Sequence, residues 1–174
     1  SLKTNKFYLS SIMINGDPKL NGHLNLYAGD TVANFNEKYL LQNYEHLKHD
    51  DFQGSTWAPH LIHKDLWNEV GGFSEEFSPG MGSDPDLNMK LWKAGVRIFK
   101  GLNNFKVYHF GSVSLRKKKE LVRNKGNRSF LRKWGISSDL FIKFYLNSRK
   151  PYLGPLNAKP TVGFKYLIEL MQCK

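Results

Sequence analysis

The 174-residue sequence has one cysteine, few acidic residues and no long apolar run. Its single cysteine, Cys173, excludes a disulfide within the chain and a metal cluster held by cysteines, and it favours a reducing, intracellular setting. No apolar run approaches the roughly 18 residues that a membrane-spanning helix needs, and the first residues lack the pattern of a signal peptide. We therefore expect a cytoplasmic protein of one domain.

The shortage of acidic residues is concentrated in one segment. The chain has 26 Lys and Arg against 15 Asp and Glu, a net charge of +11, and residues 116–150 hold twelve of the basic residues beside Glu120 and Asp139. Such a segment suits an anionic partner, either nucleic acid or the anionic inner face of a membrane. An apolar fraction of 40% is sufficient for a folded core, so disorder is not expected.

Apolar runs separated by Gly, Pro, Asn and Asp predict an α/β fold. The runs that are rich in β-branched and aromatic residues predict strands over 6–14, 24–28, 96–100 and 105–110, the last two joined by a turn. Helical spacing predicts helices from Asn34 to about residue 48, over 63–70, and from Ser83 or Asp84 to Gly95. The basic remainder is expected to be helical in pieces, with interruptions at Gly126, Gly135, Pro151, Pro155 and Pro160.

Five pieces of sequence occur in an order that resembles a known family. They are WAP at 57–59, VGGFSEEF at 70–77, GSDPDLNMKLWKAGVRI at 82–98, VYHF at 107–110 and NRSFLRKWG at 127–135. Together, from Thr56 to Gly135, they resemble the second half of the nucleotide-binding domain of family 2 glycosyltransferases, the inverting enzymes of the GT-A fold. The resemblance implies a GT-A-like mixed sheet with flanking helices over residues 1–150, with 151–174 as a helical extension of the same domain.

The resemblance also implies an activity, the transfer of a sugar from a nucleotide-sugar donor to a hydroxyl of a saccharide or lipid-linked acceptor. Asp84 matches the aspartate that serves as general base in the family. A sugar hydroxyl is a poor nucleophile near neutral pH, so a positioned carboxylate has to accept its proton. The alternative, from the residues alone, is that Asp84 and Asp86 only cap a helix and complement its dipole.

Further roles come from the same resemblance. His109 matches a histidine that completes a Mn²⁺ or Mg²⁺ site or lies beside the donor diphosphate, although a histidine at a strand end can equally be structural. Arg116 and Lys117 fall in a segment similar to the loop that closes over the donor pyrophosphate, and the alternative for them is a solvated charged face.

On the acceptor side the resemblance implies contacts from Trp57, Ser83 and Asp86. Ser83 stands where the family usually has glutamate, so the acceptor contacts differ there. A tryptophan beside proline is as often a core residue as a stacking platform for a sugar, and we expect Asp86 to be mainly structural.

The family's Asp-x-Asp motif and its preceding strands have no counterpart before residue 56. We therefore expect the chain to be the acceptor-side portion of a GT-A domain, inactive alone, with an unpaired apolar sheet edge that favours a homodimer. Peripheral contact with an anionic membrane fits a lipid-linked acceptor, and nucleic acid is not the expected partner. The alternative is a nucleic-acid or membrane-binding module at residues 116–150, whose aromatic spacing nevertheless suggests a buried helical stripe (Phe130, Trp134, Phe141, Phe144).

Overall fold

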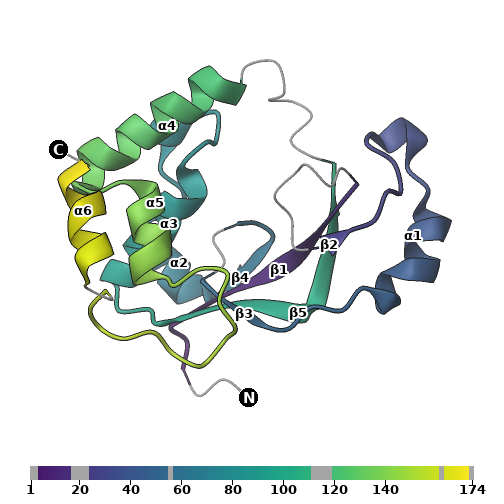
Figure 1. The fold of residues 1–174 in the computed structure, drawn as a ribbon, viewed down its shortest axis with the longest axis horizontal. Helices are drawn as coiled ribbons and strands as arrows, with labels where there is room; N and C mark the ends of the chain where they lie inside the picture. The colour runs from purple at the N-terminus through teal and green to yellow at the C-terminus, as the bar shows by residue number, and fades with distance from the viewer. Residues whose placement is uncertain (1–3, 17–23, 55–56, 111–118, 161–162, 173–174) are drawn as a thin grey trace.

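The computed structural model describes residues 4–16, 24–54, 57–110, 119–160 and 163–172, without the side chains of 119–124 and 172. These residues form a mixed α/β fold in which helices flank a sheet of parallel and antiparallel strands (Figure 1). The strands are β1 Phe7–Asn15, β2 Leu24–Asn25, β3 Phe52–Gln53, β4 His60–Ile62 and β5 Ile98–His109. The helices are η1 Val32–Asn34, α1 Glu37–Asn43, η2 Tyr44–His46, α2 Lys64–Val70, η3 Glu75–Phe77, α3 Ser83–Lys93, α4 Lys119–Trp134, α5 Ser138–Leu140, η5 Phe141–Tyr145 and α6 Phe164–Gln172.

Strand β1 lies inside the sheet, whose order is β2-β1-β5-β3 with β4 also paired to β1. Its run of apolar residues suits this place, since a strand covered on both faces needs no polar alternation. β1 runs parallel to β5 on one side, and on the other it pairs with β4 at residues 8–10 and with β2 at residues 14–15. β1 therefore has partners on both sides, and a homodimer through an open sheet edge stays a prediction.

Strand β5 is one long strand where the sequence predicts two strands and a turn. Along its pairing with β1, the partner advances from Gly101 to Lys106 while β1 advances only from Ser10 to Ile12. The extra residues form a bulge in a continuing strand. Asp51 holds this bulge, because its carboxylate accepts from the backbone N of Asn103 at 2.8 Å and pairs with Lys100 at 2.5 Å.

Helix α1 is shorter and less buried than predicted. Asn36, rather than Asn34, caps it by accepting from the backbone N of Tyr39 at 2.9 Å. Asn34 is used elsewhere, because its side-chain oxygen accepts from the backbone N of Asp30 and Thr31. No residue of α1 is buried, so its apolar spacing does not correspond to a core face.

Glycines set several helix ends, as predicted. Gly71, Gly95 and Gly135 follow α2, α3 and α4 with φ of 70°, 88° and 73°, a region that glycine adopts without strain. The predicted interruption at Gly126 is wrong, because this residue lies within α4. A Cβ at Gly126 would overlap the carbonyl oxygen of Met81, so the glycine lets α4 touch the loop before α3.

The main core lies between the sheet and helices α2, α3, α4 and η5. Tyr8 and Phe99 contribute from the strands, and the helices add fully buried Leu87, Leu91 and Phe130. The C-terminal region packs against the same body: Pro151 bridges to Phe52, and the ring of Tyr166 in α6 contacts that of Phe144 in η5. Over the described residues, none of the helices is long and apolar enough to cross a bilayer.

Candidate active site

Asp84 lies in the first turn of α3, directly after the loop that joins η3 to this helix. The N-cap is Gly82, with φ of 92°, and Ser83 is the first helical residue, so neither Ser83 nor Asp84 is the cap. Of the alternative that the sequence offered, the capping role of Asp84 is therefore not observed, whereas its place in the first turn of α3 still suits the helix dipole. The residue is half-buried.

The carboxylate of Asp84 is held without a charge partner. Among the described residues it forms no ion pair, and burial raises its pKa from the ordinary 3.8 to about 6. Desolvation disfavours the ionised form and so makes the carboxylate a stronger proton acceptor than an ordinary aspartate. A group of this pKa is still mostly ionised at pH 7 to 8.

Two buried residues connect Asp84 to the sheet. Tyr8 of β1 is fully buried and donates its hydroxyl to the backbone oxygen of Trp57 at 3.1 Å. Burial first and the charge of Asp84 second raise the pKa of Tyr8, whereas the neighbouring side chain of Asn88 lowers it. Asn88, one turn after Asp84, donates its amide to the backbone oxygen of Asp84 at 2.8 Å. Asn88 thus holds the turn that carries the carboxylate, and Tyr8 lies close enough for the charge of Asp84 to act on its hydroxyl.

Unpartnered polar atoms surround the same tyrosine. The Oγ of Ser10, the Nδ1 of His60 and the Oδ1 of Asn88 are buried and have no hydrogen-bond partner within the part of the chain that the structure describes. Ser10 pairs with His60 across β1 and β4, and the His60 ring stacks on Tyr8 with centroids 5.1 Å apart. Burial lowers the pKa of His60 and favours its neutral imidazole. These polar atoms lie in the same part of the core as the first turn of α3. Tyr8 links the two, because it stacks on His60 and also lies near Asp84 and Asn88.

Asp86 has a different environment two residues later. It is fully buried, and its carboxylate accepts from Ser74 at 2.6 Å, from the indole N–H of Trp134 at 2.8 Å and from Lys133 at 3.0 Å. These bonds join η3, α3 and α4. The expected acceptor contact of Asp86 is wrong for this conformation, because no part of the side chain is exposed, and its structural role is the one observed.

Ser83 and Trp57, the other acceptor-side residues, lie at different places. The hydroxyl of Ser83 donates to the backbone oxygen of Gly80 at 2.5 Å, and the residue lines a cavity of about 270 Å³ with Phe73 and Phe77. The indole N–H of Trp57 donates to the backbone oxygen of Ser11 at 3.3 Å, and its ring stacks on Phe52. Ser83 is thus near Asp84 in an accessible place, whereas Trp57 is partly buried against the sheet.

His109 is at the far end of β1 from Asp84. It pairs with Asn15, and its Nδ1 lies 3.1 Å from the side-chain oxygen of that residue. Tyr8, the neighbour of Asp84, lies seven residues before Asn15 on β1, which is about 23 Å at about 3.3 Å per residue. No group of three or more His, Cys, Asp or Glu side chains that could hold a metal ion occurs among the described residues.

The basic segment is described only in part. Arg116 and Lys117, the expected phosphate ligands, lie outside the described residues. On α4, Lys125, Arg128 and Arg132 are exposed, at a spacing that places them on one side of the helix. Two aromatic residues of the basic segment, Phe130 and Phe141, are fully buried and so cannot stack on nucleic-acid bases.

Sequence reasoning missed Tyr8, His60 and Asn88. Tyrosine and two serines within an otherwise apolar strand were the available indication, because polar side chains in a central strand need partners or a use. Comparison with known proteins adds no assignment: no protein-family model, no curated protein and no solved structure matches this chain.

Proposed function

We propose that this chain is the acceptor-side portion of a GT-A-like domain of an inverting glycosyltransferase, with Asp84 as its general base. The observation that carries the proposal is the contrast between two neighbouring aspartates. Asp86 is buried and neutralised by Lys133, whereas Asp84 is partly exposed, lacks an ion pair among the described residues and has its pKa raised by burial. A carboxylate with a raised pKa is a better proton acceptor than an ordinary aspartate and suits proton abstraction.

In the proposed reaction, Asp84 accepts the proton of the acceptor hydroxyl as its oxygen attacks the anomeric carbon of the donor sugar. The bond from that carbon to the nucleotide diphosphate breaks, and the diphosphate leaves with the electron pair. Attack from the face opposite the leaving group inverts the anomeric centre. Asn88 supports the base by donating its side-chain amide to the backbone oxygen of Asp84 in the first turn of α3.

The donor half of the site remains a prediction. Of the proposed metal ligands the described residues supply one imidazole, that of His109, which already contacts Asn15. We therefore assign no step to a Mn²⁺ or Mg²⁺ ion. Arg116 and Lys117 stay proposed contacts of the donor pyrophosphate.

The test uses the complete protein that contains this chain and measures sugar transfer. Asp84→Asn should lower kcat by about 10² to 10⁴, the usual contribution of a general base. Asp65→Asn is the control, because this exposed aspartate on α2 has a side chain that is 79% accessible and no proposed role. If Asp84→Asn keeps transfer within a fewfold of the unchanged protein, Asp84 is not the base.

A membrane role is the second candidate. Lys125, Arg128 and Arg132 form an exposed basic face on α4, which suits an anionic surface and a lipid-linked acceptor. Sedimentation with vesicles of anionic lipid, at low and high salt, should show binding that is lost when all three residues are changed to glutamine. Binding to random oligonucleotides but not to vesicles would favour the nucleic-acid alternative instead.

A further inference from the structure

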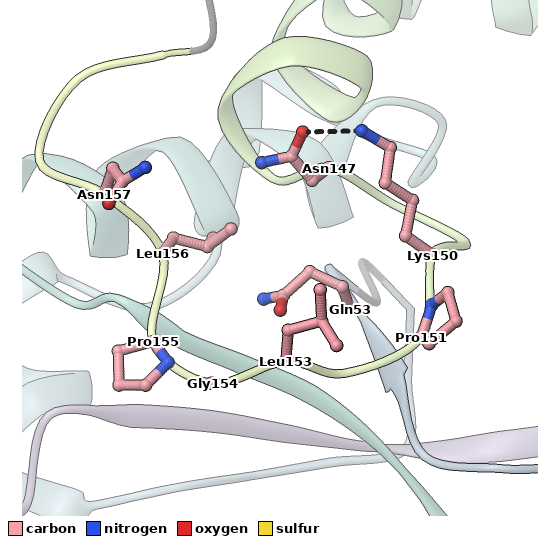
Figure 2. A pocket seen from close by; sticks show the side chains of 9 residues that line it. All are labelled: Gln53, Asn147, Lys150, Pro151, Leu153, Gly154, Pro155, Leu156 and Asn157. Carbon is pink, nitrogen blue, oxygen red and sulfur yellow. Dashed lines mark hydrogen bonds between the residues drawn. The ribbon is translucent and has the colours of Figure 1, made fainter.

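A second cavity lies beside β3, apart from the residues around Asp84. It has a volume of about 300 Å³ and is enclosed by Gln53 and the loop of residues 147–157 (Figure 2). This volume is at the small end of the range for ligand sites and is enough for one sugar unit. Its apolar wall includes Leu153, Pro155 and Leu156.

Gln53 presents a hydrogen-bond acceptor to this cavity. The residue is 4% exposed, and its backbone N donates to Lys150 while its backbone oxygen accepts from Arg149. Its side-chain Nε2 donates to the backbone oxygen of Phe99 at 3.1 Å, which fixes which way the amide faces. No hydrogen bond from another described residue reaches the remaining atom, Oε1, so this oxygen can accept from a ligand in the cavity that Gln53 lines.

Asn147 presents a donor to the same cavity. Its φ of 50° lies in the left-handed region, which asparagine tolerates better than most residues. Lys150 donates its ammonium group to Oδ1 of Asn147 at 3.2 Å, so the amide nitrogen of Asn147 faces away from the lysine (Figure 2). The nitrogen Nδ2 has no partner among the described residues and keeps both of its hydrogens for a ligand.

One acceptor, one donor and an apolar wall match a secondary amide that carries a methyl group. Its N–H would donate to Gln53, its C=O would accept from Asn147, and its methyl would contact Leu153 and Leu156. We propose that this cavity binds the acetamido group of an N-acetylated sugar. An anion fits less well, because the free oxygen of Gln53 would repel it and the charge of Lys150 is already directed at Asn147.

This saccharide site does not depend on the proposed role of Asp84, because it is tested by binding rather than by transfer. The 174-residue chain, labelled with ¹⁵N, is titrated with methyl N-acetylglucosaminide and followed by NMR. The side-chain amide signals of Gln53 and Asn147 should shift and saturate. Methyl glucoside and methyl glucuronide should bind about tenfold more weakly, as expected when one or two hydrogen bonds are lost.

Variants separate this site from nonspecific sugar binding. Asn147→Asp keeps the acceptor for Lys150 but replaces the donor with an oxygen, so the Kd for the acetamido sugar should rise about tenfold or more. Leu153→Ala removes part of the wall at a residue that is 93% exposed, and it should weaken binding a fewfold without affecting folding. Asn104→Asp, an equal change at an exposed residue of β5, is the control and should leave the Kd unchanged.

Several results would overturn the proposal. Equal affinity for the glucoside would show that the acetamido group is not recognised, and tighter binding of the glucuronide would show that the cavity is an anion site. Titration without saturable shifts would show that it is not a sugar site. Retained affinity in Asn147→Asp, in a protein whose NMR spectrum shows an intact fold, would place any binding elsewhere.

Discussion

Replacing Asp84 with asparagine should stabilise the fold at neutral pH, although it removes the proposed base. Burial raises the pKa of this carboxyl from 3.8 to about 6, so the folded protein binds a proton more tightly than the unfolded chain does. Between pH 3.8 and about pH 6 the unfolded chain holds fewer protons than the folded protein does. The free energy of unfolding therefore falls as the pH rises through this range. Asparagine has nearly the same shape as aspartate but no charge, so it avoids the cost of burying an ionised carboxylate.

The size of the effect follows from the pKa. A rise of about 2 units corresponds to about 3 kcal/mol, because each unit is worth 1.36 kcal/mol. Partial exposure of Asp84 makes this an upper value. The gain in Asp84→Asn should be fully present above pH 6, shrink as the pH falls from 6 to 4, and be absent below about pH 4. A gain of 2 to 3 kcal/mol would raise the Tm of a domain of this size by several degrees.

Urea denaturation of the 174-residue chain and its Asp84→Asn variant, at pH 4 and pH 8, measures this difference. Asp65→Asn provides the control, since its exposed carboxylate lies in the first turn of α2 beside His63 and its loss should lower the free energy of unfolding by less than about 1 kcal/mol. A variant less stable than the unchanged chain at pH 8 would refute the reasoning. That result would mean that the ionised carboxylate stabilises the helix, as a cap or through the dipole, and that burial does not dominate.

Two further changes test the packing around the site. Lys133→Met leaves the buried Asp86 without its cation and should lower the free energy of unfolding by about 3 to 5 kcal/mol in urea titrations. The control, Lys143→Met, breaks an exposed ion pair and should lower it by less than about 1 kcal/mol. Equal losses would contradict a special contribution of the Asp86 pair. Gly126→Ala should lower the Tm in calorimetry, because its Cβ meets the carbonyl oxygen of Met81 and pushes α4 from the loop before α3, and an unchanged Tm would contradict this close contact.

Local features of the fold could be predicted where local chemistry decides them. Gly71, Gly95 and Gly135 mark helix ends because the left-handed turn there requires little more than a missing side chain. Gly126 is also a glycine, but it lies inside a helix. A side chain is excluded there by close contact with Met81, in a loop 45 residues earlier in the chain. The bulge in β5 was likewise missed, because Asp51, far away in sequence, holds it.

The candidate site shows the same division. Asp84 could be singled out from the motif around it, and the mainly structural role of Asp86 was anticipated. That Asp86 pairs with Lys133 and Trp134 could not be predicted, since those partners lie on α4 and only the tertiary fold brings them close. Tyr8 and Asn88 were missed for the same reason, because a tyrosine in an apolar strand becomes informative only when its neighbour is known to be Asp84.

The pH dependence of kcat/KM for sugar transfer tests the role of Asp84 most directly. In the complete protein, the rate should rise with pH through about 6 as the carboxyl group loses its proton, and should then level off. The residual rate of Asp84→Asn should lack this rise. A profile that is flat between pH 5 and 7, or the same rise in the asparagine variant, would contradict the assignment of Asp84 as the base.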